Sequence, residues 1–477
     1  MLYFMKKIIF LTTMLLALAF YGPIDLYAQD DSNEPETDDL ANINPESIAM
    51  DSVNSFKAAF GITQIGDETF VGTRLQPELT FSKFGFGLDI PIQFNIDDKS
   101  FRSDEFKGGV EVLRLVRYFR FGRKKVDPVY VRVGDMGGVS MGYGALVNNY
   151  TNSPNFESRK FGVNLDINIK KIFGIEALYS DIKGFNLFGI RPYVRPFKTT
   201  SIPIVKSLEF GYNYVKDKAE NVENAVFLQQ DGVQGSGFDA GVTFLNTSFI
   251  KLIGYGQSTK LNKIKSDSLD QQFIEDGITN YGEGKGSSFG LYSHMKLAGT
   301  AFILDTRIER LSYEDHYLPQ FFDAIYEINK DAKIRSLGTA SSSNGIYGTL
   351  STTILEKFRI TGGILLPDVV SEETPALVQV QLETSQLGKV NIKGSYIKGG
   401  LADLSDAFKF DERSLANVDF SYQMASFLLV GVDYKWTFAR LEDDTIEATD
   451  YYRPYFALTI PLGGGGKSKR QEDTVGR

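Results

Sequence analysis

Histidines are the residues best suited to acid–base chemistry near neutral pH, and this chain has two, His294 and His316. His294 lies in the segment SSFGLYSHMKLAG, on the same side of a predicted strand as Tyr292 and Lys296. A histidine base in a hydrolase works with a serine or an acidic partner held beside it. Because no local signature for such a partner is present, we expect no enzymatic activity and interpret His294 as a residue without a catalytic role.

A second segment with the composition of a functional motif is GGGGKS at residues 463–468, which looks like a phosphate-binding loop. That motif requires a glycine at position 461, where the chain has Pro461, and it requires a following helix, which the sequence does not predict. The chain also has no cysteine, which excludes disulfides and thiolate metal sites. We therefore expect a flexible tail at residues 463–477, and neither a cofactor nor a metal.

Arginines and acidic residues are the remaining candidates for binding chemistry. Arg191 and Arg195 share one side of an extended segment, and Phe188, Ile190 and Val194 take the other side. Two arginines on one face could bind an anion. We expect them instead to be balanced by acids on other strands: Asp305, Glu309, Asp166 and Asp433. The net charge of -9 comes without a basic block, so no nucleic-acid partner is expected.

Strict alternation of side-chain types predicts the elements that carry these groups. In LVGVDYKWTFAR (residues 429–440), Val430, Val432, Tyr434, Trp436 and Phe438 alternate with small or polar residues. A β-strand sends successive side chains to opposite faces, so this segment is predicted to be a strand with one apolar face. The same pattern recurs at residues 71–81, 86–97, 161–170, 208–214, 378–383 and 417–422.

The length of these runs indicates a membrane environment. Several span ten residues or more, whereas strands of soluble proteins average about five to six residues. A tilted strand that crosses a bilayer needs about nine to eleven. After residue 20 the chain has no apolar run long enough for a membrane-spanning helix. Any membrane contact must therefore come from a β-barrel.

The connections between the strands support the same conclusion. Counted back from residue 451, long polar segments and tight turns alternate, which is the asymmetry of a barrel with extracellular loops and periplasmic turns. Carried toward the N-terminus, the alternation makes residues 122–127 and 170–171 periplasmic turns. We predict an all-β fold: a single transmembrane antiparallel up-and-down barrel of about 20 strands, within a range of 18 to 22.

In such a barrel the polar face of each strand lines the lumen, because a charge on the lipid face is unfavourable by about 2–4 kcal/mol at the bilayer midplane. Mixed charge then predicts a wet, polar lumen. The residues predicted to line it are Arg74, Glu78, Asp89, Asp166, Arg191, Arg195, Asp305, Arg307, Glu309, Asp433 and Lys435.

Two loops are candidates for closing the lumen. Residues 135–158 are rich in glycine, and Gly137, Gly138, Gly142 and Gly144 would allow close packing against a wall as a constriction, with an ordinary loop as the alternative. Residues 318–332 place aromatic and aliphatic side chains at near-helical spacing behind a proline. We predict a short amphipathic helix there, resting on the rim or folding into the mouth, and favour the rim.

The N-terminal residues are predicted to lie outside the barrel. Residues 1–28 have the form of a secretory signal peptide: Lys6 and Lys7, an apolar run, and Ala28 at a small-residue cleavage site. Residues 29–51 are acidic and have no periodicity, which predicts a flexible lead-in. The barrel is then expected to extend over residues 52–462.

The signal peptide, the strand pattern and the final strand YYRPYFALTIPL together resemble Gram-negative outer-membrane β-barrels of the porin-like kind, over residues 52–462. In that family the last strand is read by the barrel assembly machinery and usually ends the chain with an aromatic residue. Here Leu462 stands in that place and a tail follows, which favours a distant lineage, of Bacteroidota type. The lead-in is too short to form the plug domain of the energy-coupled receptors.

The resemblance implies an outer-membrane protein in contact with lipid and lipopolysaccharide. Its lumen would be a polar pore for passive or substrate-selective diffusion of small polar solutes. The alternative is a non-conducting barrel that serves as a scaffold or as a secretion or assembly partner. The resemblance transfers no binding residues and leaves the oligomeric state open.

Overall fold

The computed structural model describes residues 55–461 except 66–67, 82, 104–105, 107–110, 155–158, 185, 219–231, 265–282, 385–387, 412 and 441–445. The predicted signal peptide, lead-in and C-terminal tail, and with them the glycine run at residues 463–466, lie outside the described residues.

Within these residues nearly all regular structure is β-strand, as the period-two alternation predicts. The first half of the sheet contains β1 (Ser55–Ile65), β2 (Glu68–Phe81), β3 (Phe84–Leu88), β4 (Ile90–Asn95), β5 (Val116–Phe121), β6 (Val129–Gly134), β7 (Gly162–Ile169), β8 (Phe173–Tyr179), β9 (Phe188–Val194) and β10 (Glu209–Asp217). The second half contains β11 (Gly232–Asn246), β12 (Ile250–Ile264), β13 (Glu283–Leu297), β14 (Phe302–Tyr313), β15 (Ser343–Ile354), β16 (Phe358–Pro367), β17 (Ala376–Thr384), β18 (Val390–Leu401), β19 (Ser414–Ala425), β20 (Leu428–Arg440) and β21 (Ile446–Pro461).

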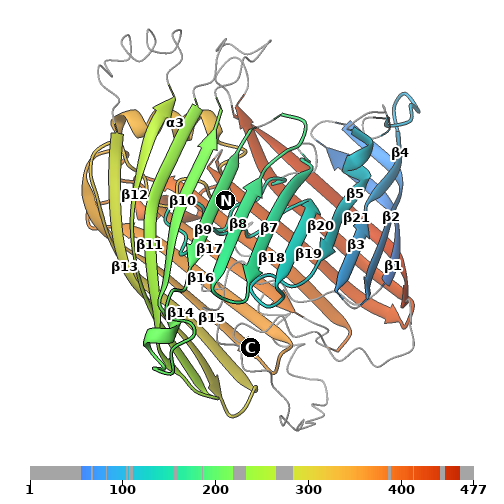
Figure 1. Ribbon diagram of the computed structural model, residues 1–477. Coiled ribbons are helices and arrows are strands. Elements are labelled where there is room, and N and C mark those ends of the chain that lie inside the picture. The colour runs from blue at the N-terminus through green and yellow to red at the C-terminus, as the bar shows by residue number, and fades with distance from the viewer. Residues whose placement is uncertain are drawn as a thin grey trace.

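These strands form a closed antiparallel barrel in which each strand pairs with its neighbours in the sequence (Figure 1). β1 and β21 close the ring, with Ser55 opposite Pro461 and Phe60 opposite Phe456. β3 and β4 pair with β2 in one continuous register and act as a single strand interrupted at Asp89. The described residues therefore form a barrel of 20 strands, and the predicted fold class and strand number are confirmed.

Short turns gather at one end of the barrel and long connections at the other. Residues 170–172, 247–249, 298–301, 355–357 and 426–427 are short turns, and residues 314–342 and 402–413 are longer connections at the opposite end. One described connection differs from the pattern. Residues 195–208, at the short-turn end, include the 3-10 helix η4 (Val205–Ser207).

Strand length also differs around the ring. β11, β12 and β13 each have 15 residues, whereas β5 and β6 have six and β8 and β9 have seven. The strands of this wall are shorter than the roughly nine to eleven residues of a tilted strand that crosses a bilayer. There the chain leaves the sheet early, at Gly134, and residues 135–152 continue inside the barrel.

The two faces of the sheet have opposite chemistry. Outward positions carry large apolar side chains that are exposed, among them Phe238, Phe289, Ile308 and Phe456. Inward positions carry buried charged and polar groups, among them Arg191, Arg307 and Asp305. In a soluble protein this arrangement would expose the apolar belt to water and bury the charged groups, which is unfavourable.

The α-helix α3 (Lys330–Thr339) and the 3-10 helices η3 (Glu111–Leu115) and η5 (Leu404–Phe408) lie in connections between strands. In the part of the chain that the structure describes, no helix is both long and apolar enough to cross a membrane.

Candidate functional site

Two segments that connect strands fold into the barrel and meet inside it. We call residues 135–152 inner loop A and residues 314–342 inner loop B. Their backbones pair directly: Val147 and Phe322 form a parallel bridge, the Phe322 N–H donates to the Leu146 carbonyl (2.9 Å), and the Asn148 N–H donates to the Phe322 carbonyl (3.0 Å). The two loops therefore form one unit.

Inner loop A contains the four glycines of the predicted constriction, and its backbone turns at two of them. Gly142 has a φ of 55° and Gly144 a φ of 84°, a backbone region that other residues rarely adopt. At Gly142 a Cβ would lie 2.7 Å from the Arg191 Nε atom, so the loop approaches the wall as closely as a glycine allows. Gly138 also has a positive φ, while a Cβ at Gly137 would meet no atom within 4 Å.

Side chains of the wall hold inner loop A in place. The ring of Tyr143 stacks on that of Tyr255 from β12, with centroids 4.8 Å apart and planes 10° apart. The Tyr143 carbonyl accepts a hydrogen bond from Arg307 of β14. The Ala145 N–H donates to Gln257 Oε1 (3.0 Å). Burial of the Tyr143 ring raises the pKa of its hydroxyl well above its ordinary value.

Inner loop B supplies the apolar part of this core. Phe321, Phe322 and Tyr326 are fully buried and pack edge to face. The Tyr326 hydroxyl donates to Asp217 of β10 (2.7 Å), and Lys330, at the start of α3, forms an ion pair with the same carboxylate (3.0 Å).

The predicted helix at residues 318–332 is wrong in position, and the favoured location on the rim is wrong as well. The α-helix starts at Lys330, whereas the backbone around Phe322 pairs with inner loop A instead of forming helical hydrogen bonds. Asp323 also accepts from the Ile325 N–H (3.2 Å), which fixes a turn there. The aromatic side chains that suggested an amphipathic helix fill the space between the two loops.

The barrel interior has two sides, which differ in exposure. We call the inward residues of β8–β16 the packed side. Each inward position of β8, β9, β10 and β14 is buried. We call the inward residues of β18–β21, β1 and β2 the accessible side, where most charged inward groups keep contact with solvent. The charged inward groups of the accessible side that keep contact with solvent are Lys57, Glu78, Lys393, Asp419, Asp433 and Lys435.

Arg191 and Arg195 are balanced by acids of neighbouring strands, and these are not the acids expected from the sequence. Arg191 donates to Glu176 (3.0 Å), Glu209 (2.7 Å) and Asp239 (2.9 Å), which come from β8, β10 and β11. Arg195 shares Glu209 through an ion pair of 2.7 Å. Buried charges in this arrangement are compensated in place and form a structural network.

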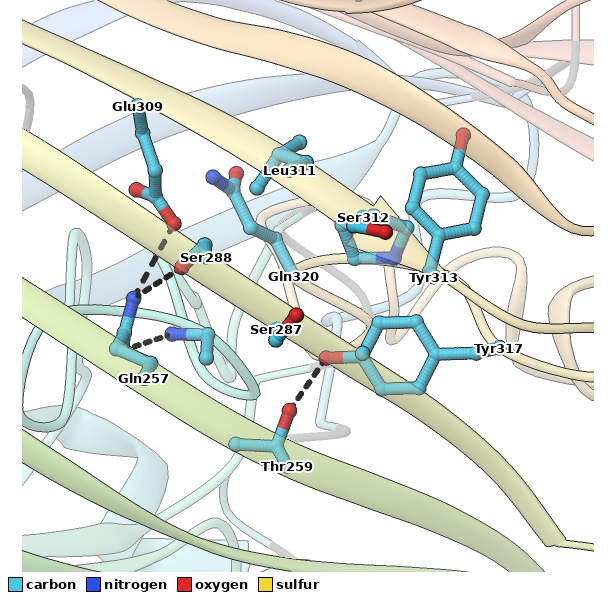
Figure 2. A pocket seen from close by; sticks show the side chains of 13 residues that line it. Gln257, Thr259, Ser287, Ser288, Glu309, Leu311, Ser312, Tyr313, Tyr317 and Gln320 are labelled. Atoms are coloured by element: carbon cyan, nitrogen blue, oxygen red, sulfur yellow. Dashed lines mark hydrogen bonds between the residues drawn. The ribbon is translucent and has the colours of Figure 1, made fainter.

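A second network of the packed side surrounds Arg307. Its guanidinium donates to Glu309 (2.7 Å) and to the Tyr255 hydroxyl (2.8 Å) as well as to inner loop A. Figure 2 shows the adjoining cavity, where Gln257 contacts Ser288 and Glu309 and where Tyr317 reaches Thr259. That cavity measures about 10 Å³, the space of about one water molecule.

His294 lies on the packed side in contact with an acid. Its Nδ1 atom lies 2.8 Å from Asp305 Oδ1, which also accepts from the Tyr292 hydroxyl (2.7 Å). The opposite ring atom, Nε2, is buried and has no hydrogen-bond partner among the described residues. A catalytic triad would place a nucleophilic hydroxyl at that nitrogen. Within the described ranges the pair thus has an orienting acid and no third member.

The structure places the predicted lining residues at inward positions but divides them between the two sides. Arg191, Arg195, Asp305, Arg307 and Glu309 belong to the packed side and are buried. Asp166, on β7 next to that side, accepts from the Lys125 N–H (3.0 Å). The remaining members lie near or within the accessible side: Arg74, Glu78, Asp89, Asp433 and Lys435.

Arg74 and Asp89 form a buried ion pair that Arg159 joins, and Glu78 pairs with Arg117. Sequence reasoning missed Lys57, Lys393, Asp419 and Arg453 of the accessible side. Each occupies an inward position in an alternating strand, so the period itself could have identified them.

Comparison with known proteins gives no family: no family model and no curated protein matches this chain. Several solved structures of barrels are similar to it. Wzi of Escherichia coli, described as an outer-membrane carbohydrate-binding β-barrel involved in capsule assembly, has 10% identity and a TM-score of 0.34, covering 86% of this chain and 85% of that one. OccK5 (OpdH) of Pseudomonas aeruginosa has 10% identity and a TM-score of 0.31, covering 86% and 98%.

CdiB of Acinetobacter baumannii has 7% identity and a TM-score of 0.28, covering 85% of this chain. This chain spans 60% of the length of CdiB. What these proteins share with the chain is the β-barrel architecture.

Proposed function

We propose that the protein is an outer-membrane channel for small polar solutes. Inner loops A and B fill the lumen along the packed side, and water fills it along the accessible side. The observation that carries this proposal is the contrast between the two sides. Inward charges of β8, β9, β10 and β14 are buried, whereas those of β18–β20 keep solvent contact, with 58% of the Lys393 side chain exposed.

The location in a membrane is supported by the outer face. Phe289 is 70% exposed, Phe238 68% and Ile308 64%. At about 25 cal/mol per Å² of apolar surface, a belt of such side chains is stabilised by contact with lipid. A closed barrel leaves no unpaired strand edge, which is the condition for strands to cross a bilayer. The predicted signal peptide agrees with export to the outer membrane.

The inner loops give the channel its selectivity by narrowing the lumen. Their contacts with the wall combine stacking, buried hydrogen bonds and the aromatic cluster of inner loop B, so the narrowing is a fixed part of the fold. A solute then passes between these loops and the accessible side, where it meets both positive and negative side chains. This arrangement favours small, polar solutes over large or apolar ones.

A non-conducting barrel is the second candidate, and the depth of loop packing favours it. Phe321, Phe322 and Tyr326 are fully buried, as expected of a permanent plug. Such a barrel would serve as a scaffold or as a secretion or assembly partner. We propose no enzymatic activity, because no hydroxyl of the described residues bonds to His294 Nε2. Loss of a hydrolase activity on His294→Ala would overturn that part.

Electrical recording from the full-length protein in planar bilayers separates the two candidates. A channel gives discrete single-channel steps, and swelling of proteoliposomes in small uncharged sugars accompanies them. A barrel that inserts, as shown by its heat-dependent gel mobility, but gives neither steps nor swelling would refute the channel and establish the non-conducting alternative.

A further inference from the structure

We propose that Arg453 and Lys435 form a binding site for small oxyanions on the accessible side of the lumen, taking solutes that carry a carboxylate or a phosphate group. The role of the site in transport rests on the proposed channel function, whereas the binding itself does not. The inference comes from donors that the fold leaves without acceptors.

Arg453 is the centre of the site. It lies on β21 opposite Asp433 of β20, and 4% of the residue is exposed. Its Nη2 atom lies 3.6 Å from Asp433 Oδ2, which is too far for a hydrogen bond. The Nε and Nη1 atoms are buried and have no hydrogen-bond partner among the described residues. Buried charged donors without an acceptor are strongly unfavourable, so such a group calls for an external acceptor.

The neighbouring acid that could have filled this role is engaged elsewhere. The Tyr455 hydroxyl donates to Asp419 Oδ1 (2.9 Å) and accepts from Lys57 Nζ (3.1 Å). The Tyr455 ring crosses Gly431, where a Cβ would lie 2.5 Å from the ring. The Arg453 guanidinium lies over the same ring, 5.0 Å from its centroid. The Tyr455 hydroxyl thus lies between Lys57 and Asp419, and its ring packs against the Arg453 guanidinium.

Lys435 adds a second free cation on the same face. It follows Asp433, the residue opposite Arg453, by one inward position toward the long-loop end of β20. It makes no ion pair or hydrogen bond within the described part of the chain. Its charged neighbours are Asp433, Arg74, Arg159 and Asp135. Arg74 and Arg159 are both paired with Asp89, so neither takes an acceptor from Lys435 and neither is free to bind the ligand in its place.

The unsatisfied atoms at this place are therefore donors. A ligand that fits must bring acceptors only and negative charge, which describes carboxylates and phosphates. The planar guanidinium presents Nε and a terminal nitrogen side by side, the geometry that binds two oxygens of one oxyanion. A cation or an uncharged sugar would leave the guanidinium unneutralised.

Isothermal titration calorimetry on the full-length protein in detergent tests the site, with sodium succinate and sodium phosphate as separate probes in a chloride buffer. We expect binding of at least one probe, an affinity about tenfold lower in Arg453→Gln and about threefold lower in Lys435→Gln, and a partial loss in Arg453→Lys, since charge-assisted donors account for the binding. Lys393→Gln is the matched control: it is an inward lysine of the same side, already paired with Glu383 (2.9 Å), and its removal should leave binding unchanged.

No binding of either probe, or equal affinity in wild type and in folded Arg453→Gln, would overturn the inference. If Arg453→Gln does not fold, Lys435→Gln against Lys393→Gln decides instead, and equal affinities there also overturn it. Preference for succinate or for phosphate identifies the ligand class. Single-channel steps without binding refute this site alone, whereas binding without steps refutes the channel alone.

Discussion

The packed and accessible sides of the barrel interior use similar residues for opposite purposes. On the packed side Arg191 is surrounded by three carboxylates and is fully buried. On the accessible side Arg453 faces one carboxylate at 3.6 Å and keeps two nitrogens without an acceptor. An arginine whose donors are all paired stabilises the fold. One whose donors are free can act on a solute.

Removing inner loop A is the strongest way to break this contrast. Replacing residues 137–149 by a short Gly–Ser linker should detach inner loop B from the wall and open the packed side. We expect single-channel conductance to rise about threefold or more, because the pore cross-section sets the current. The same replacement at residues 404–408, in a connection at the same end of the barrel, should leave conductance unchanged. Equal conductance in all three proteins would contradict the role of inner loop A.

Deleting one positive charge on each side compares their energetics. Arg191→Gln leaves three buried carboxylates without their shared partner, which should destabilise the barrel by about 3–5 kcal/mol. Lys393→Gln breaks an exposed ion pair, with an expected effect below about 1 kcal/mol. Urea unfolding in detergent, followed by heat-dependent gel mobility, measures both. Comparable losses would show that the accessible side is as tightly packed as the other.

A smaller change sharpens the contact between inner loop A and the wall. Tyr143→Leu removes the stack on Tyr255, a loss of about 1 kcal/mol. The chain has no cysteine, so Leu146→Cys introduces a single thiol in the loop. Its maleimide labelling should quicken about fivefold on addition of Tyr143→Leu. Tyr434→Leu, which removes an outward ring packed on Trp436, is the control and should leave the labelling rate unchanged.

The smallest effect expected is that of pH. Burial raises the pKa of the Tyr143 and Tyr150 hydroxyls well above the value of about 10 in the unfolded chain. A raised folded-state pKa contributes stability that is constant below pH 10 and is lost as the pH rises beyond it. Liposome swelling in an uncharged sugar should thus be flat from pH 7 to 9 and increase above 10. An increase below pH 9 would assign the loosening to other groups.

The sequence was sufficient to predict the barrel and its strand number. A strand whose two faces contact different environments alternates apolar and polar residues, and this alternation can be read locally. The sequence also named Gly142 and Gly144 as positions of close packing, but their positive φ was not part of that expectation. It could not separate the two sides of the interior, since Arg191 and Arg453 occupy equivalent positions in alternating strands. The separation depends on contacts between distant segments, such as Val147 with Phe322.

Inner loop B shows why local periodicity failed there. The spacing of Phe321, Phe322 and Tyr326 fits one face of a helix, but tertiary contacts overrode that preference. Likewise, the short strands β5 to β9 follow from the chain entering the lumen at residue 135. No residue within these strands indicates that the chain turns into the lumen after Gly134.

The pairing of β1 with β21 has a kinetic consequence. Ser55 and Pro461 stand opposite each other, so the first strand of the ring must wait for the last before both its edges are hydrogen-bonded. Until then a partly formed sheet exposes two open edges, which invite pairing with other chains. Contacts of such high sequence separation also fold slowly. Loss of β21 would therefore prevent closure of the ring and leave two strand edges unpaired, which would make the chain prone to aggregate.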